Sequence, residues 1–482
     1  MEAAQHEQVW DVAVLGAGLS GLYAARDLAR AGRSVVVLEA RRRVGGRTES
    51  VPHRGDAYDV GGQWVGPGQT LVLALIEELG IAKKRQRWFA PPAAPPAAGP
   101  PRAGGAEPPA TAAAASAAGA GALPPRPPAA AAAWDAADCG AWLAGACATA
   151  GALRELRLFV QTVMATDADD LSLLFFLRYL RAAGGAAGLA DGDGGAQSER
   201  LAGGAQALSE GLARQVAAAG GEVLLGYVVG GVGGAADAAA AAVVAARRVI
   251  VAMPPPVWRA LAFDPPLPRG HGVLAARLAM GRCVKVIALY PRRFWALDGD
   301  AAATAGGDAI ASDDVSAGGG GKQRLWAAGG PGRRLEDCGP VANLFPGEYG
   351  GHAALVGLVT GGAAAAFAAL PEAARRAAVL RQYEEFFGAP EARYPDAFVT
   401  KEWASERFSG GCFGAVAPPG ALAAAGPAAA RGAPAGGVHF AGSEAAGRWA
   451  GYFEGALDAG RRTACEVDAA LKGQPAGGAS AT

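Results

Sequence analysis

Apolar and polar positions follow a strand–helix–strand pattern over residues 9–40. The run VWDVAVLG (9–16) is apolar enough for a strand buried on both faces, and SVVVLEA (34–40) predicts a second such strand. Between them, LYAARDLARAG (22–32) has the spacing of an amphipathic helix, which Gly32 should end. The pattern predicts a βαβ unit with two parallel strands.

Later segments extend this pattern along the chain. Strand-like runs follow at residues 222–229, 243–255, 283–290 and 438–445, the last ending in a turn. Helices are predicted over residues 71–79, 153–181, 208–219, 373–387 and 451–470. We therefore expect an α/β fold in which strand-rich segments late in the chain return to the first unit.

Two low-complexity segments interrupt the pattern. Residues 89–133 consist mainly of Ala, Pro and Gly and contain almost no large apolar side chains. Such a segment cannot offset the entropy cost of its own ordering, so we predict a loose insert. A Gly-rich patch follows over about residues 299–339, and residues 467–482 should form a flexible tail.

Composition and charge exclude several classes of protein. The 482 residues suffice for two or three domains, and 51% hydrophobic with 18% charged residues argues against a disordered chain. Forty-four basic residues balance 44 acidic ones, so no nucleic-acid partner and no membrane-surface binding are expected. With no signal peptide and no strongly apolar run of transmembrane length, we expect a cytoplasmic protein without a membrane anchor.

Cysteine and histidine spacing argues against a metal site. The six cysteines include no CxxC pair, and the five histidines show no HxxxH or HExxH spacing. Six cysteines are also too sparse for a disulfide framework in a chain of this length.

A glycine fingerprint marks a candidate nucleotide site. Gly16, Gly18 and Gly21 form GxGxxG, but with 73 glycines in the chain about one or two such matches arise by chance. The context carries the prediction, because the motif lies between a buried strand and a helix. The helix N-terminus would then bind pyrophosphate, and Glu39 would accept hydrogen bonds from ribose hydroxyls. A glycine-rich turn without a ligand is the alternative.

The segment after Glu39 identifies the family. LEARRRVGGRT (38–48), which includes Arg41, Gly45, Gly46 and Arg47, resembles the flavin-containing amine oxidase superfamily, which binds FAD. Blocks such as YDVGGQWVGPGQ, MGRCVKVIALYPRRFW, EWASERFSGGCFGAVAPPG and VHFAGSEAAGRWAGYFEGA resemble monoamine oxidases in order and spacing. No second fingerprint suggests a nicotinamide domain, so electrons should pass from an organic substrate to O2.

The resemblance implies a two-domain architecture. A discontinuous Rossmann-like FAD-binding domain would comprise residues 1–88, 200–262 and 402–466. An α+β substrate-binding domain would comprise residues 134–199 and 263–401. The sequence does not define the oligomeric state, and a homodimer is left open.

The resemblance implies that three further residues contact the cofactor. Cys412, in SGGCFG, matches the cysteine that bonds through sulfur to the 8α-methyl group of the flavin in monoamine oxidases. A buried, unmodified thiol is the alternative. Glu444 matches an acidic residue near the ribityl–phosphate portion, although a solvated or capping glutamate is the alternative. Arg47 would face the pyrophosphate, unless the neighbouring arginines form only a solvated basic turn.

The resemblance also supplies candidates around the flavin ring. Lys285, in an apolar strand, would lie by flavin N5 and hold a water, although an edge lysine reaching solvent is the alternative. Tyr452 matches one of two tyrosines that face the flavin in the family, and Phe413 occupies the place of the other, so a phenol dipole is lost. Trp449 joins this aromatic set, for which core packing is the alternative. Gln197 falls in a segment resembling the substrate-cavity strand, with one extra residue.

These observations predict an FAD-dependent amine oxidase. The expected reaction converts primary (aryl)alkyl monoamines to imine and then aldehyde, while O2 is reduced to H2O2. A polyamine or L-amino-acid oxidase on the same fold is the first alternative. A catalytically impaired flavoprotein is the second, because of the insert, the Gly-rich patch and Phe413.

Overall fold

The computed structural model describes residues 9–86, 128–189, 194–233, 243–295 and 334–473. Its first layer is a five-stranded parallel sheet in the order β18-β10-β1-β2-β8. These strands are β1 (Trp10–Leu15), β2 (Val35–Glu39), β8 (Glu222–Leu225), β10 (Ala246–Val251) and β18 (Val438–Phe440). The predicted βαβ unit and the late return of strands to it are confirmed.

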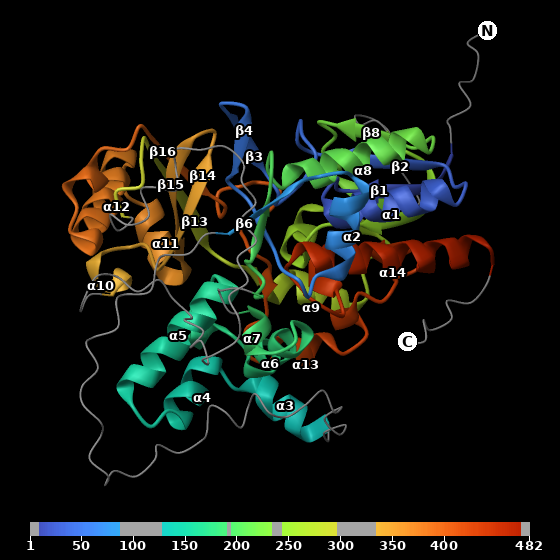
Figure 1. Cartoon of the computed structure of the whole chain (residues 1–482). Helices are drawn as coiled ribbons and strands as arrows, with labels where there is room; N and C mark the ends of the chain where they lie inside the picture. Colours follow the sequence, from blue (N-terminus) through green and yellow to red (C-terminus); the bar gives the residue numbers. More distant parts are fainter. Residues whose placement is uncertain (1–8, 87–127, 190–193, 234–242, 296–333, 474–482) are drawn as a thin grey trace, which may run out of the picture.

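Three helices cover one face of this sheet. Helix α1 (Leu19–Arg30) packs against α8 (Gln206–Ala218) on one side and α14 (Phe453–Leu471) on the other, as Figure 1 shows. The helix α1 ends where the sequence predicts, because Gly32 adopts φ +79°, a conformation that favours glycine. Apolar side chains of these helices bury the sheet face, so this half of the molecule has its own core.

The strands are shorter than the apolar runs that predict them. β8 ends at Leu225, because Gly226 at φ +82° turns the chain away after four residues. β10 covers only Ala246–Val251 of the run 243–255, and prolines follow it. The run 438–445 gives three strand residues and then the 3-10 turn Ser443–Ala445, which confirms the predicted turn.

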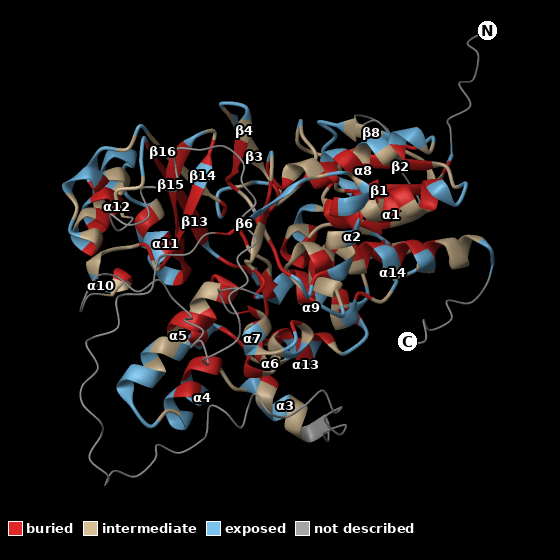
Figure 2. Cartoon of the chain, in the orientation of Figure 1, coloured by how far each residue is buried: buried red, intermediate tan, exposed pale blue. Residues whose placement is uncertain are grey.

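The second layer is an antiparallel sheet in the order β14-β15-β13-β16. Its strands are β13 (Cys283–Tyr290), β14 (Asn343–Tyr349), β15 (His352–Thr360) and β16 (Ala397–Glu402). All residues of β13 and β15 are buried, as Figure 2 shows. Helices α11 (Gly361–Ala368) and α12 (Glu372–Phe387) cover one face. The other face packs in a second buried cluster, and four of its residues border a cavity: Cys283, Lys285, Phe345 and Leu358.

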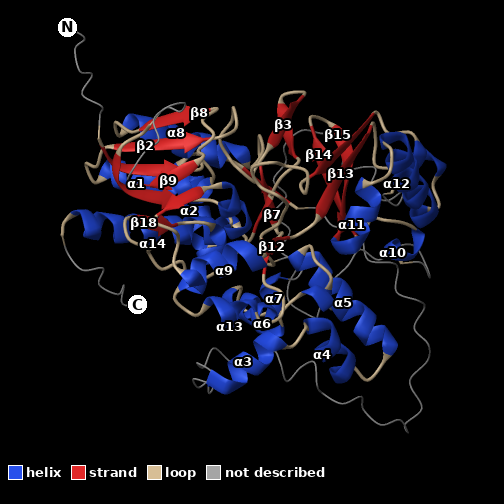
Figure 3. Cartoon of the chain, turned by 180° about the vertical axis from the view of Figure 1, so that it is seen from behind, coloured by secondary structure: helices blue, strands red, loops and turns tan. Residues whose placement is uncertain are grey.

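A helical lobe lies below both sheets in Figures 1 and 3. It contains α3 (Pro128–Ala136), α4 (Cys139–Ala146), α5 (Ala150–Met164), α6 (Leu173–Ala182) and α7 (Ala186–Leu189). The single helix predicted over 153–181 is wrong. Ala165 takes a left-handed φ of +53° and ends α5, and the Ser172 Oγ accepts a hydrogen bond from the Phe175 N–H to begin α6.

Both low-complexity predictions need correction at their C-terminal ends. Residues 128–133, assigned to the insert, form the start of α3, because alanine has the highest helix propensity. Residues 335–338, assigned to the Gly-rich patch, form α10 (Leu335–Cys338). The tail predicted over residues 467–482 is likewise wrong at its start, because residues 467–471 form the last turns of α14 (Phe453–Leu471). Residues 89–127, 299–333 and 474–482 lie outside the described residues.

Short elements join these layers. They are the strands β3 (Ser50–His53), β4 (Asp56–Asp59), β5 (Trp64–Val65), β6 (Lys83–Arg85), β7 (Glu199–Leu201), β9 (Gly231–Gly233), β11 (Ala262–Asp264), β12 (Ala279–Met280) and β17 (Ala415–Val416), and the helices α2 (Thr70–Glu78), α9 (Arg269–Arg277) and α13 (Ala421–Ala425). Further 3-10 turns are Ala168–Asp170, Pro255–Ala260, Pro390–Arg393 and Ala429–Arg431. Within the described ranges, no helix is long and apolar enough to cross a bilayer.

Candidate active site

A cavity of about 580 Å³ runs from the β1–α1 turn to the inner face of the antiparallel sheet. Its walls come from both sheets, from the helical lobe and from the segments 407–416 and 443–456. Of the sequence-predicted site residues, the structure brings these to the cavity wall: Gly16, Gly18, Glu39, Arg41, Gly45, Gly46, Arg47, Gln197, Lys285, Cys412, Phe413, Glu444 and Tyr452. Gly21 and Trp449 do not line it.

The three fingerprint glycines have different surroundings. A Cβ on Gly21 would lie 2.1 Å from the Gly16 oxygen, and one on Gly16 would lie 3.0 Å from the Ala252 oxygen. These two positions need glycine for close packing of helix and strand. A Cβ on Gly18 would meet nothing within 4 Å, and Gly18 lines the cavity. The middle glycine therefore leaves the backbone open to a ligand.

Glu39 holds this turn in shape. Its buried carboxylate accepts one hydrogen bond from the Ala17 N–H and one from the Arg41 N–H, each at 2.9 Å. The Gly45 N–H donates to the Ala17 oxygen at 2.8 Å, which joins the second glycine motif to the first. The Arg41 guanidinium donates to the Ser409 Oγ at 2.8 Å and to Glu406 at 3.2 Å. Arg41 is therefore part of an ordered network and not a solvated turn.

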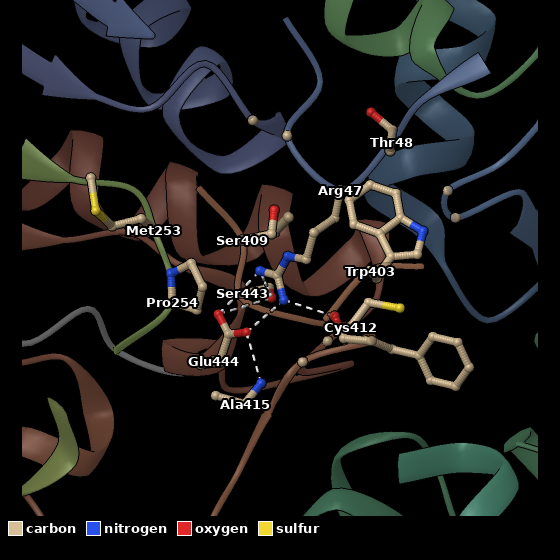
Figure 4. A pocket seen from close by; sticks show the side chains of 18 of the residues that line it. Arg47, Thr48, Met253, Pro254, Trp403, Ser409, Cys412, Ala415, Ser443 and Glu444 are labelled. Atoms are coloured by element: carbon tan, nitrogen blue, oxygen red, sulfur yellow. Dashed lines mark hydrogen bonds and ion pairs between the residues drawn. The ribbon is translucent and has the colours of Figure 1, made fainter. Parts of the chain in front are cut away.

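Arg47 and Glu444 form an ion pair at the centre of the cavity wall (Figure 4). The Arg47 Nη1 lies 2.6 Å from the Glu444 Oε1 and also donates to the Phe413 oxygen at 2.8 Å. The same carboxylate oxygen accepts a hydrogen bond from the Ala415 N–H at 3.1 Å. Although burial opposes ionisation, Arg47 and these donors hold the pKa of Glu444 below its ordinary range. The pair thus fixes the segment 413–415 against the glycine motif.

Cys412 is buried in the cavity wall with its thiol free. The glycines before it allow a close approach, since a Cβ on Gly411 would lie 2.4 Å from the Gly281 oxygen, which accepts from the Cys412 N–H at 3.0 Å. Burial and the neighbouring Cys283 raise the pKa of the Cys412 thiol, whereas Arg47 and Lys285 lower it. The unmodified thiol is therefore protonated at neutral pH.

Lys285 points from β13 into the cavity and is only 4% exposed. Its Nζ donates to the Gly61 oxygen at 2.8 Å and to the Gln63 Oε1, and lies 5.3 Å from the centre of the Trp64 ring. Burial lowers the pKa of Lys285 to about 8, although the Asp59 carboxylate opposes this effect. The alternative of an edge lysine in solvent is therefore wrong.

Aromatic side chains form part of the cavity wall. Phe413 packs with the core of the antiparallel sheet, and Tyr452 packs with the core of the helical lobe. Tyr179 lies beside Tyr452, with ring centroids 6.2 Å apart. Trp449 is buried against Tyr452 at 5.1 Å and packs over Gly68 outside the cavity. Tyr452 and Phe413 thus line the same cavity from two different cores.

Sequence reasoning missed several lining residues. Gln63 and Trp64 lie in the YDVGGQW block that carries the resemblance, yet neither was singled out. Tyr179, Phe159 and Phe345 come from helices and a strand whose aromatic residues look like ordinary core positions in the sequence. Gln197 also lines the cavity, and its buried Oε1 has no hydrogen-bond partner among the described residues.

Comparisons with known proteins agree with this site. A sequence model of the flavin containing amine oxidoreductase family matches residues 19–105 and 146–468. The AofH protein of Mycobacterium tuberculosis, whose name describes a flavin-containing monoamine oxidase, is 33% identical over 478 residues, covering 96% of this chain and 97% of that protein. The chain belongs to the flavin-containing amine oxidase family and is a monoamine oxidase-like enzyme, which confirms the resemblance.

Solved structures show the same similarity. Cyclohexylamine oxidase from Brevibacterium oxydans has a TM-score of 0.76 and 27% identity, with 96% of this chain and 100% of that chain covered. Putrescine oxidase bound to putrescine has a TM-score of 0.75 and 26% identity, with 96% of this chain and 99% of that chain covered.

Among the described residues, no group of histidine, cysteine or acidic side chains could hold a metal ion.

Proposed function

We propose that this protein carries FAD bonded to Cys412 and oxidises primary arylalkyl monoamines. The overall reaction would convert R–CH2–NH2, O2 and H2O to R–CHO, NH3 and H2O2. The observation that carries this proposal is one continuous cavity that joins an open glycine turn to an aromatic chamber containing Lys285 and Cys412. The division of the chain into a discontinuous FAD-binding domain and a substrate-binding domain, which the sequence leads us to expect, is part of the same proposal.

The residues at the wall fit a dinucleotide flavin. Gly18 leaves open space at the N-terminus of α1, where backbone N–H groups and the helix dipole favour pyrophosphate. Glu39 adjoins that turn, so it could accept hydrogen bonds from the ribose, and the Arg47–Glu444 pair would support the cavity wall beside the bound cofactor. When bound, FAD would supply the two-electron redox chemistry of the reaction.

Covalent attachment is proposed from the position of Cys412. Its side chain lines the cavity together with Lys285 and Phe413. A thioether at Cys412 would require loss of the thiol proton and of one methyl hydrogen together with two electrons, for which O2, the proposed co-substrate, would be the final acceptor. Burial and Cys283 raise the pKa of this thiol, and the charges of Arg47 and Lys285 oppose that rise in part. Cys283 lines the same wall, so it is the natural control residue.

The chamber favours a neutral amine. Apolar and aromatic walls disfavour an ammonium ion, so the amine would bind in its uncharged form, and positioning between Phe413 and Tyr452 would orient its α-hydrogen. Gln197 would donate or accept a hydrogen bond at the amine. Trp449, buried behind Tyr452, would act by supporting that ring.

A polyamine substrate fits the cavity less well. Among the described lining residues, the carboxylates are Glu39 and Glu444, and both are already engaged by backbone N–H groups or by Arg47. A second ammonium group would therefore have no free carboxylate to pair with. Putrescine and spermine should turn over at least tenfold less efficiently in kcat/KM than phenethylamine.

Two experiments test this proposal. Peroxide release from phenethylamine, benzylamine, putrescine and L-amino acids measures the substrate class, and a preference for a diamine or an amino acid would contradict the monoamine assignment. Acid precipitation measures the linkage: wild type and Cys283→Ala should give yellow pellets, whereas Cys412→Ala should release its flavin. Flavin in the wild-type supernatant would exclude a covalent bond.

A further inference from the structure

Lys285 is held by one short segment, residues 61–64. Two of the three N–H donors of its ammonium are taken by the Gly61 oxygen and the Gln63 Oε1, and the Trp64 ring lies beneath it. Gln63 is 1% exposed, and both Gln63 and Lys285 line the cavity. Within the described part of the chain, Gln63 is therefore the one residue whose side chain accepts a hydrogen bond from the Lys285 ammonium and also lines the cavity.

The orientation of the Gln63 amide follows from chemistry. An ammonium group can only donate hydrogen bonds, so the amide oxygen of Gln63 must face Lys285. Its Nε2 group then points elsewhere, and this buried donor has no hydrogen-bond partner among the described residues. The Nε2 atom is inaccessible to water, so the atom of Gln63 that matters for Lys285 is its amide oxygen.

We propose that Gln63 is a positioning residue whose amide oxygen holds the Lys285 ammonium at the cavity wall, beside the space proposed for the flavin ring. This inference rests on the proposed function, because it assumes that the flavin ring occupies the chamber beside Lys285.

Other charged groups also face Lys285. Asp59, two residues before Gly61, is fully buried and stabilises the ammonium, whereas Arg200 from β7 destabilises it. The thiols of Cys283 and Cys412, when ionised, act in the same direction as Asp59. Gln63 differs from all of these because it contacts the ammonium directly and can be exchanged for a charged or an apolar side chain of similar size.

The test measures the visible absorption spectrum of the flavin as a function of pH in the holoenzyme without substrate. Wild type should show a transition near the Lys285 pKa of about 8, and Lys285→Met should abolish it. Gln63→Glu places a carboxylate on the ammonium, so the transition should move to higher pH. Gln63→Met removes the acceptor, so it should move to lower pH.

A second measurement is the midpoint potential of the flavin. A carboxylate at position 63 disfavours the extra electrons of the reduced flavin, so the potential should fall in Gln63→Glu and change less in Gln63→Met. Gln382→Met, which removes a buried glutamine that is hydrogen-bonded at Val341 and Leu335, serves as the matched control. It should lower stability without moving either the pH transition or the potential.

Several outcomes would overturn the inference. A transition that persists in Lys285→Met, or none in wild type, would show that Lys285 does not lie at the flavin. Shifts in the same direction for Gln63→Glu and Gln63→Met, or no shift, would reduce Gln63 to a structural residue. Reduction of the flavin by phenethylamine is measured separately, so a failure of the proposed amine oxidation can be distinguished from a failure of the inference about Gln63. Gln63→Glu keeps the size and the acceptor, so it tests the inference even if Gln63→Met does not fold.

Discussion

Glu444 is a carboxylate whose side chain is only 7% exposed, and Arg47 is its compensating charge. Removing one partner of such a pair leaves an uncompensated buried charge, which costs more than the pair itself contributes. Arg47→Met should therefore lower the free energy of unfolding by about 3 kcal/mol. Arg47→Met combined with Glu444→Gln should recover part of that loss. Urea unfolding of both variants measures this, and a double variant no more stable than Arg47→Met would contradict it.

The same pair predicts a direction for acid sensitivity. Arg47 lowers the pKa of Glu444 in the folded state below the ordinary value of 4.5. A carboxylate with a lowered folded pKa contributes stability that is present above its unfolded pKa and is lost as the pH falls through the folded value. Wild type should therefore lose stability more steeply below pH 4.5 than Glu444→Gln. Thermal unfolding measured from pH 3 to pH 6 checks this, and parallel curves would contradict it.

At the residue scale, sequence reasoning found the motif residues better than their partners. Cys412, Lys285 and Glu444 stand in distinctive blocks, so the resemblance identified them. The pairing of Arg47 with Glu444 joins positions 397 residues apart, and no local pattern encodes such a contact. The unpaired atoms of Gln63 and Gln197 became visible only with the geometry of their surroundings.

At the element scale, the glycines of the β1–α1 turn have different roles: Gly21 allows close packing, whereas Gly18 leaves room for a ligand. Gly21→Ala would place a methyl group 2.1 Å from the Gly16 oxygen, so it should prevent correct folding. Gly18→Ala would place its methyl group in open space at the cavity, so the chain should fold but contain little flavin. The ratio of flavin absorbance to protein absorbance measures the difference. Full flavin content in Gly18→Ala would show that the cofactor does not approach this turn.

Helix α2 depends on a carboxylate from α14. Glu454 is 2% exposed and accepts hydrogen bonds from the N–H groups of Leu71 at 3.1 Å and Val72 at 2.9 Å, at the N-terminus of α2. A carboxylate at this position satisfies free N–H groups and complements the helix dipole. Glu454→Ala should cost about 1–2 kcal/mol of stability, as loss of a helix cap does. Glu77→Ala, at the other end of α2, is the control and should cost less.

Element boundaries were the least predictable feature of the fold. The parallel strands were found because a strand buried on both faces is continuously apolar. The break between α5 and α6 was missed because apolar spacing continues on both sides of it. A turn there depends on Ala165 at positive φ and on the Ser172 cap, and neither residue type alone marks a helix end.

At the scale of the whole molecule, the cavity is shared by the two sheets and the helical lobe. A ligand that binds only the folded chain stabilises it by mass action, by about 2.7 kcal/mol at a concentration 100 times its Kd. Cys412→Ala stripped of flavin should therefore gain thermal stability when FAD is added back, and riboflavin, which lacks the pyrophosphate, should give a smaller gain. An equal effect of both compounds would contradict binding at the glycine turn.

The central claim is that an amine delivers electrons to a flavin held in this cavity. The most direct measurement is the visible spectrum of the purified protein under anaerobic conditions before and after phenethylamine is added. The account predicts an oxidised flavin spectrum that bleaches with the amine and returns when O2 is admitted. A flavin spectrum that phenethylamine leaves unchanged, or correctly folded protein without flavin absorbance, would contradict it.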